Sequence, residues 1–167
     1  MTKYMYTLIN PVTGQRWPLL KNNLTRNLMP NCIFLQDGEH LGVVTHRDLV
    51  VFVRRCVSEV LVAQLVDEPD QSLIHVLGLV DRWLEDEKSV TPEELKAASK
   101  TAETSACTTD QPSLTIWIAM QLSRAAADIA WADWCAARSS EYAYRAGFSY
   151  ETQAQWLVEH LQQSENS

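Results

Sequence analysis

The sequence predicts a mainly α-helical protein, a helical bundle of about five helices with a small N-terminal β-hairpin element. Its 167 residues are enough for one domain with a buried core. Apolar residues recur at helical spacing from residue 45 onward, whereas residues 1–44 hold short apolar runs separated by turn residues. We therefore expect a β-containing segment over residues 1–44, a helical bundle over residues 45–163 and a disordered tail over residues 164–167.

The N-terminal segment contains three short apolar runs and strong turn signals between them. Residues 4–9 are strand-like and end at Asn10-Pro11, which is typical of a turn. A second run, residues 32–35, leads through Asp37-Gly38 into residues 41–44. Asp-Gly between two apolar runs predicts a β-hairpin. We expect three strands at most in this segment.

The first helix is expected to begin at Thr45. Thr45 and Asp48 have the spacing of a capping box, in which each side chain bonds the other residue's backbone N–H. Valines favour a strand by propensity, but the length of about 20 residues and one continuous apolar face predict a helix. That face consists of Leu49, Phe52, Val53, Cys56, Val57, Val60 and Leu61.

Two further helices are expected between residues 67 and 106. Residues 67–70 (DEPD) predict a helix start with proline in the first turn. The acidic residues 85–87 oppose the helix dipole, so we expect fraying there. Residues 91–94 (TPEE) predict the next start, and residues 107–111 read as a polar loop. The buried stripe of the first of these helices is expected to be Leu73, Ile74, Leu77, Val80, Trp83 and Leu84.

The most distinctive element is a single long helix expected over residues 112–138. It is apolar nearly all round, which is typical of a central helix with neighbours on several sides. One strip has only small side chains, which would let a neighbour approach closely: Ala119, Ala126, Ala130 and Ala137. Beyond residue 138 we expect the helix to continue with interruptions and to end at Gly147. A last helix over residues 150–163 should bury Ala154, Leu157, Val158 and Leu161.

Charge is distributed unevenly along the chain, whose formal net charge is −7. Residues 1–36 carry four basic residues and no acid, which gives +4, and the remainder carries 10 basic and 21 acidic residues, which gives −11. A general nucleic-acid binder would need a basic face, so we expect no direct nucleic-acid binding by the helical part. The basic arm either contacts a partner or lies across the acidic body, and both interpretations stay open.

No sequence motif for catalysis, metal binding or membrane insertion is present. The four cysteines and four histidines have no zinc or redox spacing, and the five glycines form no phosphate-binding loop. No apolar run reaches the roughly 20 residues of a membrane helix, and the first residues lack a signal pattern. We expect a cytoplasmic protein that is not an enzyme and has no catalytic residues, metal or cofactor. An active site assembled from distant residues without a motif stays open.

Six tryptophans are the feature that stands out. Tryptophan and tyrosine fill cores and also anchor interfaces. Near the end of the long helix, aromatic and acidic residues alternate, and this neighbourhood is our candidate partner-binding site. It comprises Asp128, Trp131, Asp133, Trp134, Glu141, Tyr142 and Tyr144. The alternative is plain packing, with tryptophans filling the space that alanines leave.

Part of the chain resembles the alanine-rich immunity proteins associated with bacterial toxin systems. The residues that carry the resemblance are Asp67-Glu68-Pro69, Asp81-Arg82-Trp83-Leu84, residues 89–98 (SVTPEELKAA), Ala125-Ala126-Ala127, Ala130, Ala132 and Ala136-Ala137. The resemblance covers residues 67–137. It implies a cytoplasmic, non-enzymatic protein that binds and blocks a partner, usually a toxin.

These observations lead to one main hypothesis and one alternative. The main hypothesis is a small acidic protein that binds and inhibits another protein, a basic toxin or defence component, because an acidic face speeds association with a basic partner. The alternative is a phage- or plasmid-encoded inhibitor of a host defence complex that mimics the charge of DNA. The sequence gives no indication of the oligomeric state.

Overall fold

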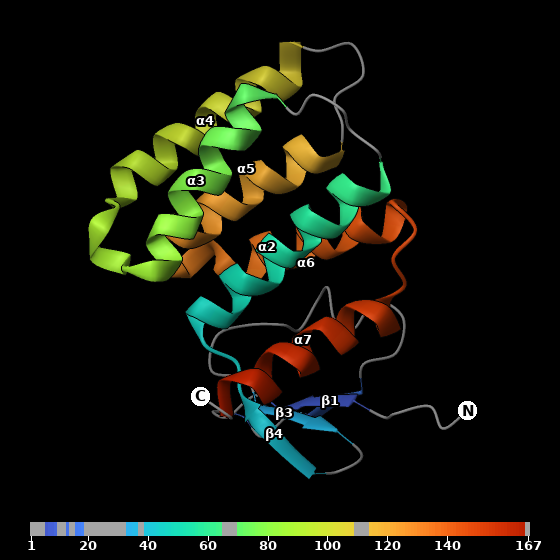
Figure 1. Ribbon diagram of the computed structural model, residues 1–167. Helices are drawn as coiled ribbons and strands as arrows, with labels where there is room; N and C mark the ends of the chain where they lie inside the picture. Colours follow the sequence, from blue (N-terminus) through green and yellow to red (C-terminus); the bar gives the residue numbers. More distant parts are fainter. Residues whose placement is uncertain are drawn as a thin grey trace.

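The computed structural model describes residues 6–9, 13, 16–18, 33–36, 39–64, 70–108 and 114–165, and in this part the chain is mainly helical. Figure 1 shows a body of packed helices with a small β-sheet at one end. The strands are β1 (Tyr6–Ile9), β2 (Arg16–Pro18), β3 (Ile33–Gln36) and β4 (Glu39–Val43). The helices are α2 (His46–Ala63), α3 (Gln71–Glu85), the short 3₁₀ turn η1 (Glu87–Ser89), α4 (Pro92–Thr108), α5 (Leu114–Ala127), α6 (Ile129–Arg145) and α7 (Tyr150–Glu165).

The sheet is antiparallel, with strand order β2-β1-β3-β4. The two runs expected to pair across Asp37-Gly38 correspond to β3 and β4, which pair antiparallel. The described strands number four rather than three at most, because β2 spans only three residues and is too short for alternation to predict it. The expected turns at Asn10-Pro11 and Asp37-Gly38 lie outside the described residues.

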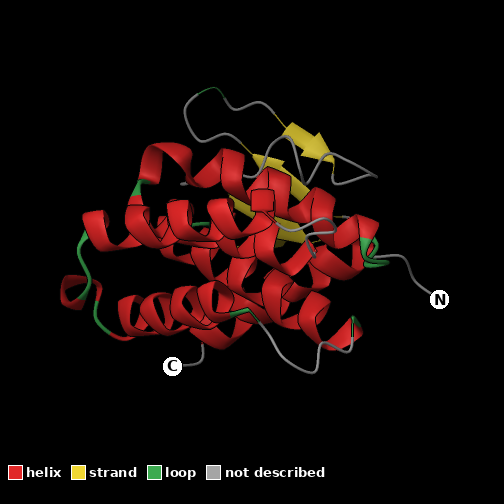
Figure 2. Ribbon diagram, turned by 90° about the horizontal axis from the view of Figure 1, so that it is seen from above, coloured by secondary structure: helices red, strands yellow, loops and turns green. Residues whose placement is uncertain are grey.

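Helix α7 links the sheet to the helical body. It contacts β4 as well as α2 and α6, and Figure 2 shows the strands gathered on one side of the helices. At Gly42 in β4, a Cβ would lie 3.7 Å from Leu161 Cδ2 of α7, which is ordinary van der Waals contact. The four residues expected to be buried in this last helix are buried, as predicted. The helix extends through residue 165, and residues 166–167 lie outside the described part.

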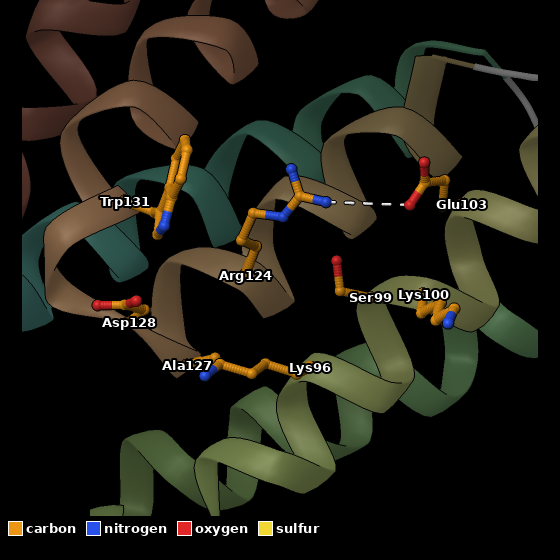
Figure 3. A pocket seen from close by; sticks show the side chains of 8 residues that line it. All are labelled: Lys96, Ser99, Lys100, Glu103, Arg124, Ala127, Asp128 and Trp131. Atoms are coloured by element: carbon orange, nitrogen blue, oxygen red, sulfur yellow. Dashed lines mark ion pairs between the residues drawn. The ribbon is translucent and has the colours of Figure 1, made fainter.

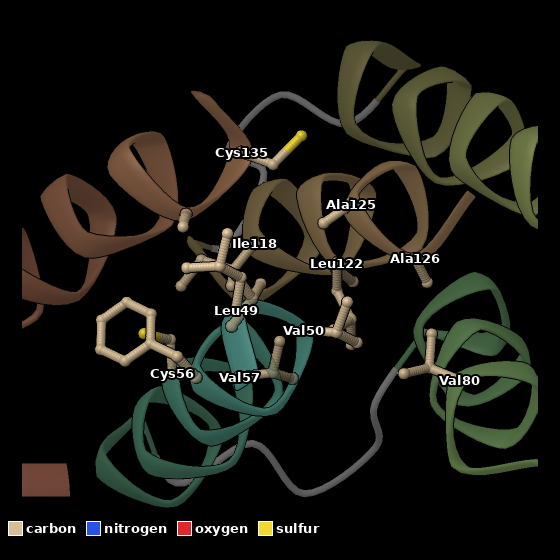
Figure 4. Close-up of a cluster of buried hydrophobic side chains, with 14 of the residues drawn as sticks. Leu49, Val50, Cys56, Val57, Val80, Ile118, Leu122, Ala125, Ala126 and Cys135 are labelled. Carbon is tan, nitrogen blue, oxygen red and sulfur yellow. The ribbon is translucent and has the colours of Figure 1, made fainter. Parts of the chain in front are cut away.

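Helix α2 begins as the sequence predicts. The Thr45 backbone N–H donates to Asp48 Oδ2 at 2.8 Å, and the Asp48 N–H donates to Thr45 Oγ1 at 3.1 Å. Its apolar face packs against α5 and α6, and Figure 4 shows side chains of α2, including Leu49 and Val50, meeting those of α5. Helix α5 contacts α2, α3, α4 and α6, so it is the central helix.

Helix α3 begins later, and buries a different face, than the sequence predicts. Asp70 is its N-cap, accepting from Ser72 N–H at 2.7 Å, so proline does not lie in its first turn. Ile74 is 46% exposed instead of buried. Contact with both α4 and α5 selects a face rotated from the predicted one. The buried residues are Leu73, Val76, Leu79, Val80 and Trp83.

Helix α4 begins with a capping box, as its sequence indicates. Thr91 N–H donates to Glu94 Oε2 at 3.0 Å, and Glu94 N–H donates to Thr91 Oγ1 at 3.1 Å. The helix runs through Thr108, so the expected loop at residues 107–108 is wrong. The acidic stretch before it ends α3 and forms η1, with Asp86 accepting from Lys88 N–H at 3.1 Å.

The prediction of one long helix over residues 112–138 is wrong, and the break brings the number of described α-helices to six. Asp128 has extended backbone angles (φ −149, ψ 113), and its side chain accepts from Ala130 N–H at 3.0 Å. An aspartate that bonds its own backbone in this way competes with helix continuation and caps a new helix. The strip of alanines is consequently divided: Ala119 and Ala126 are buried in α5, whereas Ala130 is exposed in α6.

Small residues do bring α4 and α5 close together. Ser99 Oγ donates to the Met120 carbonyl at 2.9 Å, and Ser123 Oγ donates to the Leu95 carbonyl at 2.6 Å. Each serine thus bonds the backbone of the opposite helix, and both side chains are buried. This pair of bonds fixes the position of α4 beside the end of α5.

Helix α6 continues unbroken to Arg145 and stops at Gly147, the predicted stop. Gly147 has φ +106, a conformation that glycine adopts without a Cβ penalty. Phe148 N–H donates to the Ala143 carbonyl and Gly147 N–H to the Tyr144 carbonyl, both at 3.0 Å, which is a Schellman motif.

Candidate functional site

Two tryptophans on the first turns of α6 form an exposed aromatic pair. Trp131 is 51% and Trp134 45% exposed, and their rings meet edge to face with centroids 6.0 Å apart. Large apolar side chains exposed together in this way are a feature of interaction surfaces. We call Trp131 and Trp134 the aromatic face.

Arg138 continues this surface one turn along α6. Its guanidinium lies 5.7 Å from the Trp134 ring centroid and 5.5 Å from that of Tyr142. It also pairs with Glu141 at 3.2 Å and donates to Tyr142 Oη at 3.3 Å. The candidate site predicted from the sequence did not include Arg138, although its i+4 and i−4 spacing to Tyr142 and Trp134 is the signal that places the three together.

The three predicted acidic residues do not present free carboxylates. Asp128 caps α6, Asp133 Oδ1 accepts from Trp134 N–H at 2.7 Å, and Glu141 is paired with Arg138. Within the described part of the chain, only Glu141 of these three is paired with a cation, so the neighbourhood carries the positive charge of Arg138 beside the negative charges of Asp128 and Asp133.

The two predicted tyrosines do not belong to the aromatic face. Tyr142 is buried, and Arg138 and Arg145 lie over its ring, so it packs rather than projects. Tyr144 is 54% exposed but stacks on Tyr150, with ring centroids 4.7 Å apart. It lies 13 residues along the helix from Trp131, about 20 Å at 1.5 Å per residue.

A pocket of about 410 Å³ opens beside the aromatic face, between α4, the end of α5 and the start of α6. Figure 3 shows Arg124 between Trp131 on one side and Glu103 on the other, with Ser99 nearby on α4. Arg124 Nη2 lies 3.9 Å from Glu103 Oε2. The residues that line the pocket are Lys96, Ser99, Lys100, Glu103, Arg124, Ala127, Asp128 and Trp131. The sequence interpretation missed this pocket, because it is assembled from three helices.

One cluster of exposed acidic residues lies at the corner between α3 and α4, where the exposed Arg82 and Lys88 also lie. Five carboxylates there are exposed, namely Glu85, Asp86, Glu87, Glu93 and Glu94. We call these residues the acidic corner. Figure 1 places the α3–α4 corner and the α5–α6 corner at the same end of the helical body. The acidic corner and the aromatic face thus lie at one end of the molecule.

Cys56 and Cys135 are buried, and His46 and His160 each contact a neighbouring helix, whereas Cys107 and His75 are exposed. Burial raises the pKa of the Cys135 thiol to about 12 and raises that of Cys56 further. His46 Nε2 lies 2.7 Å from the Ala125 carbonyl oxygen, and His160 Nε2 lies 2.6 Å from Asp48 Oδ1. Within the ranges that the structure describes, no three His, Cys, Asp or Glu residues are grouped to hold a metal ion, and no helix is both long and apolar enough to traverse a bilayer.

Comparisons with protein-family models, with curated proteins and with solved structures find no match to this chain.

Proposed function

We propose that this chain is a small acidic protein that binds another protein through the aromatic face and inhibits it. The observation that carries the proposal is the exposed pair Trp131 and Trp134, at the start of a helix whose opposite side is buried in the bundle. Tryptophan dominates the energetic hot spots of protein interfaces, because one side chain brings a large rigid apolar area.

The acidic corner supports a partner with basic residues around its binding surface. Its five exposed carboxylates lie at the same end of the bundle as the aromatic face. Clustered negative charge attracts a basic protein during diffusion and raises the association rate. An immunity-like inhibitor of a basic toxin or defence component combines these two features, an aromatic anchor and an acidic rim.

The same acidic corner also favours a second function, charge mimicry of DNA against a host defence complex. In that case DNA should displace the protein from its partner, and binding should weaken steeply with salt. In both functions the protein acts in the cytoplasm, where its free thiols Cys56, Cys107 and Cys135 stay reduced.

The test compares partner capture by matched variants of the full chain. Trp131→Ala and Trp134→Ala remove the anchor, and Val62→Ala on α2, 72% exposed, is the control for loss of an exposed apolar side chain. A partner that is captured by the wild type and by Val62→Ala is then purified, and its affinity for each variant is measured by calorimetry. We expect each tryptophan variant to lose about 2 kcal/mol of binding free energy, roughly 30-fold in Kd.

Inhibition is measured separately, as the activity of the purified partner with and without this chain. A partner that binds both tryptophan variants as tightly as the wild type would show that the aromatic face is not the binding surface. A bound partner that keeps full activity would refute the inhibitory role.

A further inference from the structure

We propose that the pocket between α4, α5 and α6 binds a small planar anion, an aromatic ring that carries a carboxylate or a phosphate. The ring would lie against Trp131, and the anionic group would lie between Arg124 and the lysines of α4. This proposal goes beyond the proposed function, because it concerns a small molecule in a pocket that shares Trp131 with the aromatic face.

The charges lining the pocket favour an anion. Three cationic side chains line it, Lys96, Lys100 and Arg124, against two carboxylates. One carboxylate, Asp128, already accepts the Ala130 N–H as a helix cap. The other, Glu103, lies 3.9 Å from Arg124, at the limit of an ion pair.

The lysines are the groups still available to a ligand. Lys96 and Lys100 are one turn apart on α4, and neither forms an ion pair with the residues that the structure describes. In Figure 3 the Lys96 side chain extends from α4 toward the end of α5, where Ala127 lies. An anionic group held between the helices would therefore meet cations from both walls.

The remaining lining and the volume of the pocket favour a planar ring. Trp131 offers an indole at one wall, half exposed before any ligand binds, and Ala127 adds a small apolar surface. Aromatic rings pack on indole by stacking or edge to face, and a guanidinium such as that of Arg124 stacks on rings as well as binding anions. A volume of about 410 Å³ falls within the usual range of small-molecule pockets, about 300–1,000 Å³.

The position of α4 is held by bonds that a ligand need not break. Ser99, which lines the pocket, donates through Oγ to the Met120 carbonyl, and Ser123 Oγ donates to the Leu95 carbonyl between the same two helices. The pocket is thus built on two helices joined by buried hydrogen bonds, which keeps its walls at a fixed spacing.

The experiment is calorimetric titration of the full chain with two pairs of probes. One pair is naphthalene-2-carboxylate and its neutral carboxamide, and the other is adenosine 5′-monophosphate and neutral adenosine. We expect at least one anion to bind about tenfold more tightly than its neutral counterpart, because bonds between charged groups are worth more than neutral ones. Binding of the naphthoate alone assigns a carboxylate ligand, binding of the nucleotide alone assigns a phosphate, and both results support the proposal.

Variants locate the binding. Arg124→Gln should lower the affinity for the anion about tenfold. Lys100→Gln, at an exposed position, should lower that affinity several-fold. Lys88→Gln, on η1 and outside the pocket lining, should leave the affinity unchanged. Trp131→Phe should remove the ligand-induced change in tryptophan fluorescence. The proposal is overturned if neither anion binds, if neutral probes bind equally well, or if Lys100→Gln and Arg124→Gln both bind like the wild type.

Discussion

Asp48→Ala is expected to lower the free energy of unfolding by about 3 kcal/mol, because one carboxylate stabilises two separate helices. Its Oδ2 atom accepts the Thr45 N–H at 2.8 Å and so caps α2. Its Oδ1 atom lies 2.6 Å from His160 Nε2 and so joins α2 to α7. A second charged link between these helices is Arg55 of α2, which lies 3.8 Å from Glu159 and over the Trp156 ring of α7.

The magnitude follows from the two bonds. Loss of an N-terminal cap costs about 1 kcal/mol, and loss of a hydrogen bond to a charged group costs about 1.5–3 kcal/mol. The Asp48 side chain is 11% exposed and that of His160 23% exposed, so water replaces the lost bonds poorly. Asp48→Asn keeps the shape and one acceptor oxygen, so we expect about half of the effect of alanine.

The assay is urea unfolding monitored by circular dichroism, analysed with one shared dependence of the free energy of unfolding on urea concentration. It is applied to a double-mutant cycle. Asp48→Ala, His160→Ala and the double variant together isolate the coupling between the two side chains, which we expect to reach about 1–2 kcal/mol. Asp81→Ala is the control, because the Asp81–Arg54 pair is exposed and surface pairs contribute under about 1 kcal/mol. Strict additivity of the two single variants, or a cost for Asp48→Ala no larger than the control, would refute the reasoning.

The same carboxylate predicts a pH dependence. Burial opposes ionisation of Asp48, but hydrogen bonds from His160 and Thr45 outweigh it and hold its pKa below the ordinary 3.8. A folded pKa below the unfolded value means that the ionised carboxylate stabilises the fold above pH 3.8. This contribution is lost as the pH falls through the lower folded pKa. The stability difference between wild type and Asp48→Asn should therefore shrink below pH 3.8.

Two further substitutions and one labelling experiment test the backbone geometry and the packing. Gly147→Ala should lower the free energy of unfolding by about 1 kcal/mol in thermal unfolding, because φ is +106 there. Gln153→Leu should cost about 2 kcal/mol in urea unfolding, because its buried amide bonds Ser140 and the Phe148 carbonyl. Mass spectrometry after thiol labelling should find Cys107 modified in the native protein, whereas Cys135, buried with a pKa of about 12, reacts only after unfolding.

Local signals explain which parts of the fold the sequence could predict. Both capping boxes and the glycine stop are set by residues within a few positions of each other, so they can be read from sequence. The break at Asp128 also had a local signal, an aspartate before Ile129. The apolar pattern on both sides concealed it, because α5 and α6 are each buried on more than one side.

The candidate site was predictable only in part, because periodicity does not say which neighbour covers a face. Trp131 and Trp134 were expected together and lie together, yet nothing local distinguished them from Tyr142, which is buried. The pocket required α4 and α5 to be placed beside each other, and the two serine–carbonyl bonds that do this span 21 and 28 residues. Contacts of that range are set by the whole fold.

The break at Asp128 connects the fold to both proposals. A straight helix through this position would carry Trp131 onward along the axis of α5, away from the lysines of α4. The extended backbone at Asp128 instead starts α6 in a new direction, with the Asp128 side chain and Trp131 both in the lining of the pocket. One capping residue thus ends the central helix, exposes the aromatic face and forms one wall of the pocket. Because these three consequences share one backbone geometry, the aromatic face and the pocket should be lost together when that geometry is changed.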